Sequence, residues 1–367
     1  MRWNMDRINQ FLQFLGDRKL EAFLLTNRTD VRCLSGFSGS AGVLWISEDR
    51  NAFITDFRYK TQAEQEVGEK AEIFITDSNK TYIDIIKDEK LAENKFYVGF
   101  DAHNTSYDLY RRLSVEFPDI NLIPIRSPLE EIRARKDESE IENIRQAAKI
   151  AMEALAETLP LLRPGIVEKE FAAELEYRMR KKGSEKSPFD IIVASGWRAA
   201  LPHGIASDKT IEVGEMITID YGATYAGYAS DITRTFFLGN PDEKFRRIYQ
   251  TVFDAQQAAI DAAKAGMTGK KIDDIARKII SDAGFGENFG HGLGHGLGLV
   301  VHDFPAINQR NEKPVPENAV ITIEPGIYIE GWGGVRIEDD IIVGKDGATV
   351  ITDELPRELR DIVIPVS

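Results

Sequence analysis

Acidic residues lie within apolar, β-forming segments at several places in the C-terminal half of the chain. Asp220 and Asp231 belong to two such segments, which are separated by a glycine-containing stretch. We expect a hairpin centred between Tyr225 and Ala226, in which Asp220 pairs with Asp231 and both side chains share one face. Two facing carboxylates repel each other unless a cation or a shared proton lies between them. The pattern therefore predicts either a solvated hairpin face or a chain that folds around a positive charge.

The same arrangement recurs further along the chain. Glu324 ends the apolar run 320–323, and Glu338 lies in the run 334–343, which we expect to form one strand. Most of the 60 acidic residues, set against 46 basic ones, must lie on a solvated surface. Four acids in strand-like surroundings nevertheless favour burial, which is costly for a carboxylate without compensating charge.

Histidines concentrate in one glycine-rich segment. The chain has 5 histidines, and three of them, His291, His295 and His302, fall within twelve residues. Glycine occupies every second position from 290 to 298 in the same segment. This spacing disfavours a helix and lets the backbone approach its neighbours closely. A lone histidine on an apolar strand is more often a core residue than a ligand, but three together favour a metal or catalytic site. His203, in a loop flanked by apolar residues, is a fourth candidate.

The donor set consists of carboxylates and imidazoles. Cys33 is the single cysteine, which excludes a disulfide framework and a cysteine zinc site. Oxygen and nitrogen ligands suit Mn, Co, Fe or Zn. The candidates comprise two aspartates, two glutamates and one histidine. This is more protein ligands than one ion usually has, which predicts two ions about 3.5–4 Å apart, bridged by carboxylates. The sequence lacks the His-Glu-x-x-His, nucleophile-elbow, P-loop and dinucleotide-binding motifs.

The chain divides into two predicted domains. Up to residue 130, short β-forming runs alternate with helical ones, which predicts an α/β domain with a mixed sheet. The polar segment 126–136, which includes Ser127, places the boundary, giving domains 1–130 and 131–367. Asp137 and Glu140 then predict a capping box that opens a long helix. Helices and strands follow in the second domain, which is therefore α+β.

Charge and hydropathy exclude several classes of protein. The formal net charge of −14 argues against nucleic-acid binding. No run reaches the roughly 18 apolar residues that a membrane span needs, and the N-terminal residues lack a secretory apolar core. We therefore predict a cytoplasmic protein without membrane or nucleic-acid partners.

Five blocks of the sequence resemble the pita-bread metallopeptidases, in the proline-peptidase branch that contains Xaa-Pro aminopeptidase and prolidase. These blocks are Ile-Asp220-Tyr-Gly, Asp231-Ile-Thr-Arg-Thr, His291-Gly-Leu-Gly-His295-Gly-Leu-Gly-Leu-Val-Val-His302-Asp, Glu324-Pro-Gly-Ile-Tyr and Gly-Val-Arg336-Ile-Glu338-Asp-Asp. The N-terminal part resembles the creatinase-type N-domain. The resemblance implies an α/β creatinase-like N-terminal domain followed by an α+β pita-bread catalytic domain.

The resemblance also implies roles for individual residues. The metal ligands would be Asp220, Asp231, His295, Glu324 and Glu338, with Asp231 and Glu338 bridging two divalent ions. Manganese is the expected metal, with cobalt or zinc as alternatives. The catalytic residues would be His203, His302 and Glu324. The substrate-binding residues would be His203, His291, His302 and Arg336, and Arg336 would also orient Glu338.

The implied function is that of an Xaa-Pro aminopeptidase. A bridging hydroxide would attack the N-terminal Xaa-Pro bond of peptides with proline in second position, while Glu324 shuttles the proton and His302 stabilises the oxyanion. An Xaa-Pro dipeptidase (prolidase) is the main alternative. Methionine aminopeptidase and a non-catalytic peptide-binding relative are more remote, and the complete ligand set disfavours creatinase. Relatives commonly form dimers, so a homodimer is expected.

Overall fold

The computed structural model describes residues 5–126 and 128–366. Contacts divide the chain into two compact units, Met1–Ile132 and Arg133–Ser367. Residues 1–4, at the expected non-secretory N-terminus, and Ser127, in the expected linker, lie outside the described residues. Each unit is described separately below.

The N-terminal unit is built on a six-stranded mixed sheet of order β4-β3-β2-β1-β5-β6. Its strands are β1 (Ala22–Leu25), β2 (Val43–Ser47), β3 (Asn51–Asp56), β4 (Glu72–Thr76), β5 (Tyr97–Asp101) and β6 (Asn121–Ile125). Its helices are α1 (Met5–Asp17), α2 (Arg28–Ser35), α3 (Lys60–Glu66), α4 (Tyr82–Asp88) and α5 (Tyr107–Glu116), and α6 (Glu130–Ala134) follows. The β1–β2 and β2–β3 pairs are antiparallel and the others parallel, so the prediction of a mixed sheet is confirmed.

The C-terminal unit contains two larger sheets and two small ones. The larger sheets have the orders β19-β11-β8-β7 and β13-β12-β14-β17-β18, and the small ones pair β9 with β10 and β15 with β16. The strands of the first group are β7 (Ile192–Ser195), β8 (Met216–Tyr221), β11 (Ile232–Leu238) and β19 (Val363–Ile364). Those of the second are β12 (Gly294–Gly296), β13 (Asp303–Ile307), β14 (Val320–Ile323), β17 (Asp339–Val343) and β18 (Ala348–Val350). The small pairs are β9 (Thr224–Tyr225) with β10 (Tyr228–Ala229), and β15 (Gly326–Ile329) with β16 (Gly333–Arg336).

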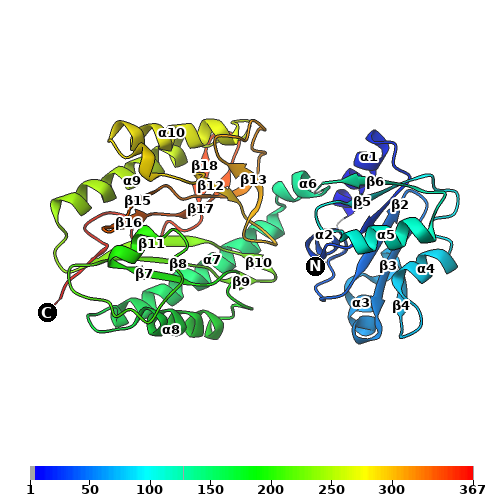
Figure 1. Ribbon diagram of the computed structural model, residues 1–367, viewed down its shortest axis with the longest axis horizontal. Coiled ribbons are helices and arrows are strands. Elements are labelled where there is room, and N and C mark those ends of the chain that lie inside the picture. Colours follow the sequence, from blue (N-terminus) through cyan, green and yellow to red (C-terminus); the bar gives the residue numbers. More distant parts are fainter. Residues whose placement is uncertain (1–4, 127, 367) are drawn as a thin grey trace. The chain divides into compact units, whose positions relative to one another are not determined.

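Two pairs of helices cover these sheets on opposite sides (Figure 1). One pair is α7 (Glu138–Thr158) and α8 (Glu168–Lys181), which contact β7, β9 and β10. The other is α9 (Glu243–Ala262) and α10 (Gly269–Asp282), which contact β13, β14, β15, β16 and β18. A continuous core of buried apolar side chains joins the helices to the sheets, as expected for layers that each bury one apolar face.

Local sequence signals fix the helix ends. Asp137 and Glu140 form the predicted capping box at the start of α7, in which each side chain accepts the other residue's backbone N–H. After α10, Gly284 has a φ of 87°, the left-handed conformation that glycine adopts without strain. The predicted capping box is confirmed.

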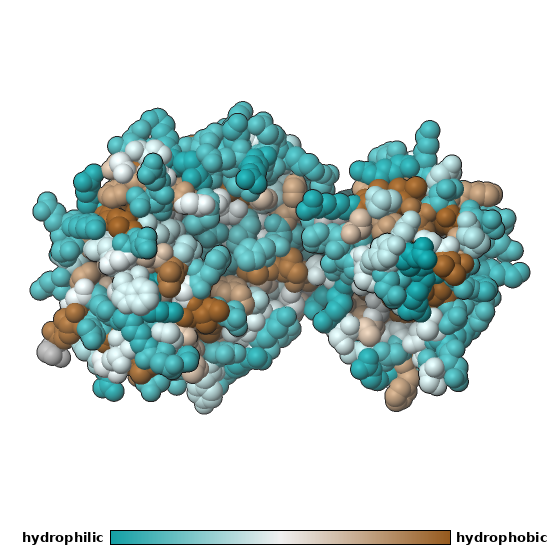
Figure 2. Space-filling model, viewed as in Figure 1, coloured by the Kyte–Doolittle hydropathy of each residue, from teal (hydrophilic) through white to brown (hydrophobic). Residues whose placement is uncertain are grey.

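The surface seen in Figure 2 is mostly polar. On the face seen in Figure 2, hydrophilic residues predominate and hydrophobic ones form small separate patches. None of the described helices has the length and apolar character needed to cross a bilayer.

Candidate metal centre

Two of the acidic residues come from the neighbouring strands β8 and β11. Asp220 lies near the end of β8, and Asp231 directly precedes β11. The predicted register is wrong, because Asp220 pairs with Thr233 rather than with Asp231. The turn consists of Ala226 and Gly227, whose φ values of 47° and 81° are typical of a type I′ turn. The register moves by two residues, so alternation still keeps both aspartates on one face.

Glu324 and Glu338 lie where strands end or change sheet. Glu324 follows β14, and Glu338 lies between β16 and β17. The prediction that 334–343 forms one strand is wrong, because β16 pairs with β15 whereas β17 joins the sheet of β14. At this break the Glu338 N–H donates to the Thr233 carbonyl at 3.0 Å. The break thus connects the second large sheet to the aspartate-bearing hairpin.

His295 brings its ring to these carboxylates from β12. Its Nδ1 lies 3.1 Å from the Gly296 carbonyl oxygen, which leaves Nε2 directed at the acids. Nε2 is 3.6 Å from Asp231 Oδ2 and 3.4 Å from Glu324 Oε1. One ligand atom each of Asp231, His295 and Glu338 lies within 4.8 Å of the others, a spacing that would hold a metal ion.

All residues that the sequence nominated line one cavity of about 800 Å³. These are Asp220, Asp231, His295, Glu324 and Glu338, together with His203, His291, His302 and Arg336. The acids lie within the protein, whereas His203 and His302 are exposed. The cavity therefore has a buried acidic end and imidazoles that reach solvent.

Arg336 connects the acids to the cavity wall. Its Nη2 donates to Asp220 Oδ2 at 2.7 Å, and its Nε donates to Thr233 Oγ1 at 3.1 Å. Thr233 Oγ1 in turn donates to Glu338 Oε2 at 2.5 Å. The direct carboxylate partner of Arg336 is thus Asp220, and Arg336 reaches Glu338 only through the threonine hydroxyl. Such outer contacts orient ligands and tune their basicity.

Burial and mutual repulsion shift the protonation of the acids. Desolvation raises the pKa of Glu324 to about 8 and raises the pKa of Asp220. It also raises the pKa values of Asp231 and Glu338 well above their ordinary range, with repulsion from neighbouring carboxylates adding to the effect. Burial lowers the pKa of His295 to about 4, so its imidazole is neutral and able to donate a lone pair.

These side chains have the chemistry of a divalent-metal site. Asp220 Oδ1 is buried and has no hydrogen-bond partner among the described residues, although an orphaned carboxylate oxygen is costly. The four acids around the neutral imidazole have raised pKa values. A bound cation would lower these pKa values again, because its positive charge favours the ionised carboxylates. The set of oxygen and nitrogen donors suits Mn, Co or Zn.

Tyr328 is a cavity residue to which the sequence pattern gave no role, although it ends the block Glu324-Pro-Gly-Ile-Tyr. The Tyr328 hydroxyl is 3.0 Å from both Arg336 Nη1 and His291 Nε2, and it lines the cavity. Its position four residues after Glu324 was the available signal. Asn288, which donates to the Tyr328 carbonyl at 3.1 Å and also lines the cavity, had no such signal.

A buried cluster of carboxylates and an imidazole, carried by two sheets between helix pairs, is suited to holding a divalent metal ion. Residues 142–345 match the model of metallopeptidase family M24, and residues 7–135 match that of the creatinase/prolidase N-terminal domain. The chain belongs to family M24. The predicted fold class, a creatinase-type N-terminal domain with a pita-bread catalytic domain, is confirmed.

Similar proteins of known structure span nearly the whole chain. An Xaa-Pro dipeptidase from Bacillus anthracis is 42% identical with a TM-score of 0.94, covering 98% of this chain and 99% of that one. An X-Pro aminopeptidase from Thermotoga maritima is 43% identical with a TM-score of 0.87, covering 97% and 99%. Among curated relatives, an Xaa-Pro dipeptidase from Pyrococcus horikoshii is 38% identical over 96% of this chain and 98% of its own length.

Proposed function

We propose that this chain is a metal-dependent Xaa-Pro peptidase that hydrolyses the bond between an N-terminal residue and proline. The observation that carries the proposal is the convergence of four carboxylates and His295 at the buried end of one cavity. Similar proteins that carry the name Xaa-Pro dipeptidase support dipeptides as substrates. The acidic end of the cavity would also attract a free α-amino group, which restricts cleavage to the N-terminus.

The five donors would hold two divalent ions. These donors are Asp220, Asp231, His295, Glu324 and Glu338, of which Asp231, His295 and Glu338 each place one ligand atom within 4.8 Å of the others. The bound ions, with manganese as the expected metal, would supply a water activated for attack near neutral pH. We further propose that the functional domains are residues 1–130 and 131–367.

The chain's own residues would move the protons and orient the peptide. Glu324, whose pKa is raised to about 8 by burial, would be returned to its ionised form by the bound cations. It would then accept the proton of the attacking water and deliver it to the proline nitrogen. Burial lowers the pKa of His302, whose neutral ring would donate a hydrogen bond to the substrate carbonyl oxygen. His203 and His291 would contact the peptide from the cavity wall, and Arg336 would hold Asp220 in place.

Cleavage of longer peptides, as by an Xaa-Pro aminopeptidase, is a second candidate. Arg336 is the only lysine or arginine among the described cavity-lining residues, and it is bonded to Asp220 and Tyr328. A dipeptide's free carboxylate would find no unpaired lysine or arginine among them. The name of the Thermotoga maritima protein also supports this candidate.

A substrate comparison tests both candidates. The metal-free protein is reconstituted with Mn²⁺, Co²⁺ or Zn²⁺ and assayed on Ala-Pro, Ala-Pro-Ala and Ala-Ala. We expect hydrolysis of Ala-Pro and none of Ala-Ala. Hydrolysis of Ala-Pro-Ala at a comparable rate would replace the dipeptidase proposal by the aminopeptidase one. Equal cleavage of Ala-Ala, or activity that survives complete metal removal, would refute the proposed function.

A further inference from the structure

The loop of residues 201–207 carries His203 into the cavity, and its larger apolar side chains face solvent rather than a core. His203 is exposed, and Leu201 and Ile205 are 45% and 54% exposed. Apart from a single bridge between Ile205 and Ile192, the loop has no regular secondary structure. Since little apolar burial anchors it, other contacts must define where the imidazole lies.

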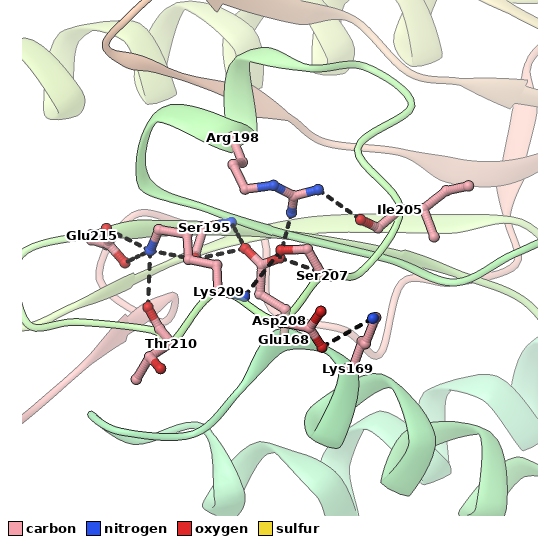
Figure 3. A network of polar contacts seen from close by, with 10 residues as sticks. All are labelled: Glu168, Lys169, Ser195, Arg198, Ile205, Ser207, Asp208, Lys209, Thr210 and Glu215. Atoms are coloured by element: carbon pink, nitrogen blue, oxygen red, sulfur yellow. Dashed lines mark hydrogen bonds and ion pairs between the residues drawn. The ribbon is translucent and has the colours of Figure 1, made fainter.

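One anchor is a buried carboxylate at the start of α8. Glu168 is fully buried and accepts two hydrogen bonds from Ser195 at the end of β7, from N–H and Oγ, both at 2.8 Å. It also accepts from the Ser207 N–H at 3.0 Å and from Ser207 Oγ at 2.7 Å. Arg198, in the 3₁₀ helix Gly196–Ala200, completes the set with an ion pair to the same carboxylate. Figure 3 shows these groups converging on Glu168.

The Arg198 guanidinium also reaches the loop itself. Its Nη1 is bonded to Glu168, and its Nη2 donates to the Ile205 carbonyl oxygen at 2.8 Å (Figure 3). On the other side of His203, Arg336 Nη1 donates to the Pro202 carbonyl oxygen at 3.3 Å. His203 therefore stands between two carbonyl groups that are each held by an arginine.

We infer that Arg198, fixed by Glu168, is a positioning residue that sets the place of the His203 imidazole in the cavity. The inference rests on the proposed function, in which His203 contacts the peptide. The planar guanidinium bonds two acceptors in a fixed geometry, which the single ammonium of a lysine does not reproduce. Positioning of this kind matters because small displacements of a group that contacts substrate cost large factors in rate.

Arg198→Lys is the main test, because it keeps a positive charge for buried Glu168 while giving up the fork to Ile205. We expect kcat/KM for Ala-Pro to fall by about 10–100-fold, the range typical of outer positioning contacts, with metal content unchanged. Lys169→Ala is the matched control. Lys169 follows Glu168 in α8, and its exposed ion pair with Asp208 does not involve Arg198 or the Ile205 carbonyl.

A double-mutant cycle separates positioning from a general structural effect. In a His203→Ala background, Arg198→Lys should change kcat/KM by less than about twofold, because the residue it positions is absent. Independent, multiplicative losses from the two substitutions would overturn the inference. So would a loss of metal from Arg198→Lys.

Amide hydrogen exchange gives a readout that does not need the peptidase activity. Exchange at 201–207, including the Ser207 N–H, should accelerate at least tenfold in Arg198→Lys and remain unchanged in Lys169→Ala. Unchanged exchange in Arg198→Lys would overturn the inference whatever the substrate. Failure of the wild-type protein to cleave Xaa-Pro bonds would refute the proposed function, and the exchange result would still decide whether Arg198 holds the loop.

Discussion

Replacing Asp231 by Asn should have opposite effects on the metal-free and metal-loaded protein. Asp231 is 5% exposed, and burial together with the charge of Glu338 raises its pKa well above the ordinary value. Each unit by which the pKa is raised lowers the free energy of unfolding by about 1.4 kcal/mol once the carboxyl ionises. A group with a raised folded pKa contributes its full stability below its unfolded pKa of about 3.9, and this contribution is lost as pH rises through the folded pKa. Asn does not ionise, so the variant does not lose stability in this way as the pH rises.

The metal-free Asp231→Asn protein should therefore be more stable than the wild type, increasingly so at high pH. A difference of about 2 kcal/mol would raise Tm by roughly 4–8 °C for a domain of this size. Saturating Mn²⁺ should reverse the order. At 100 times Kd an ion stabilises the wild type by about 2.7 kcal/mol, whereas the variant lacks a proposed metal ligand and should gain almost nothing.

Calorimetry measures the difference in Tm between variant and wild type under four conditions: at pH 6 and at pH 9, each with and without Mn²⁺. Asp208→Asn is the control, because the Asp208 side chain is 89% exposed and should show no such pH-dependent difference. An Asp231→Asn protein whose Tm advantage fails to grow with pH would refute the electrostatic reasoning. One that binds Mn²⁺ as tightly as the wild type would refute the assignment of Asp231 as a ligand.

Three further predictions concern the site and a buried ion pair in the strands that carry it. Thr233→Val removes the hydroxyl that donates to Glu338 and should weaken metal binding about 10–100-fold with the fold retained, measured by metal titration; unchanged affinity would contradict it. Metal addition should release protons at pH 7 but fewer at pH 9, because Glu324 with a pKa of about 8 is largely protonated only at the lower pH; a pH electrode in weak buffer records this, and equal release would argue against it. Arg234→Met leaves Asp339 buried without its closest cation, at 2.7 Å, and should cost about 3–5 kcal/mol in urea unfolding; a loss below 1 kcal/mol would be inconsistent with this pair.

The sequence by itself determined the chemistry of the site. Carboxylates in apolar β-forming runs and histidines in a glycine ladder were enough to nominate every donor that lines the buried end of the cavity. The reason is physical: an acid within a core pattern requires compensation, and that requirement is visible without coordinates. The alternation of β-forming and helical runs in the N-terminal unit, and Asp137 at the start of α7, were local signals that the sequence also displayed.

Only the tertiary structure decided how these residues meet. The hairpin register depended on Ala226 adopting a positive φ, which its residue type does not announce. The break at Glu338 arose because successive strands pair with different sheets, a consequence of long-range pairing. The bond of Arg198 to Glu168 likewise joins segments that lie apart in the sequence. Residue type thus identifies which groups are chemically able to act, whereas contacts between distant segments determine where each group points.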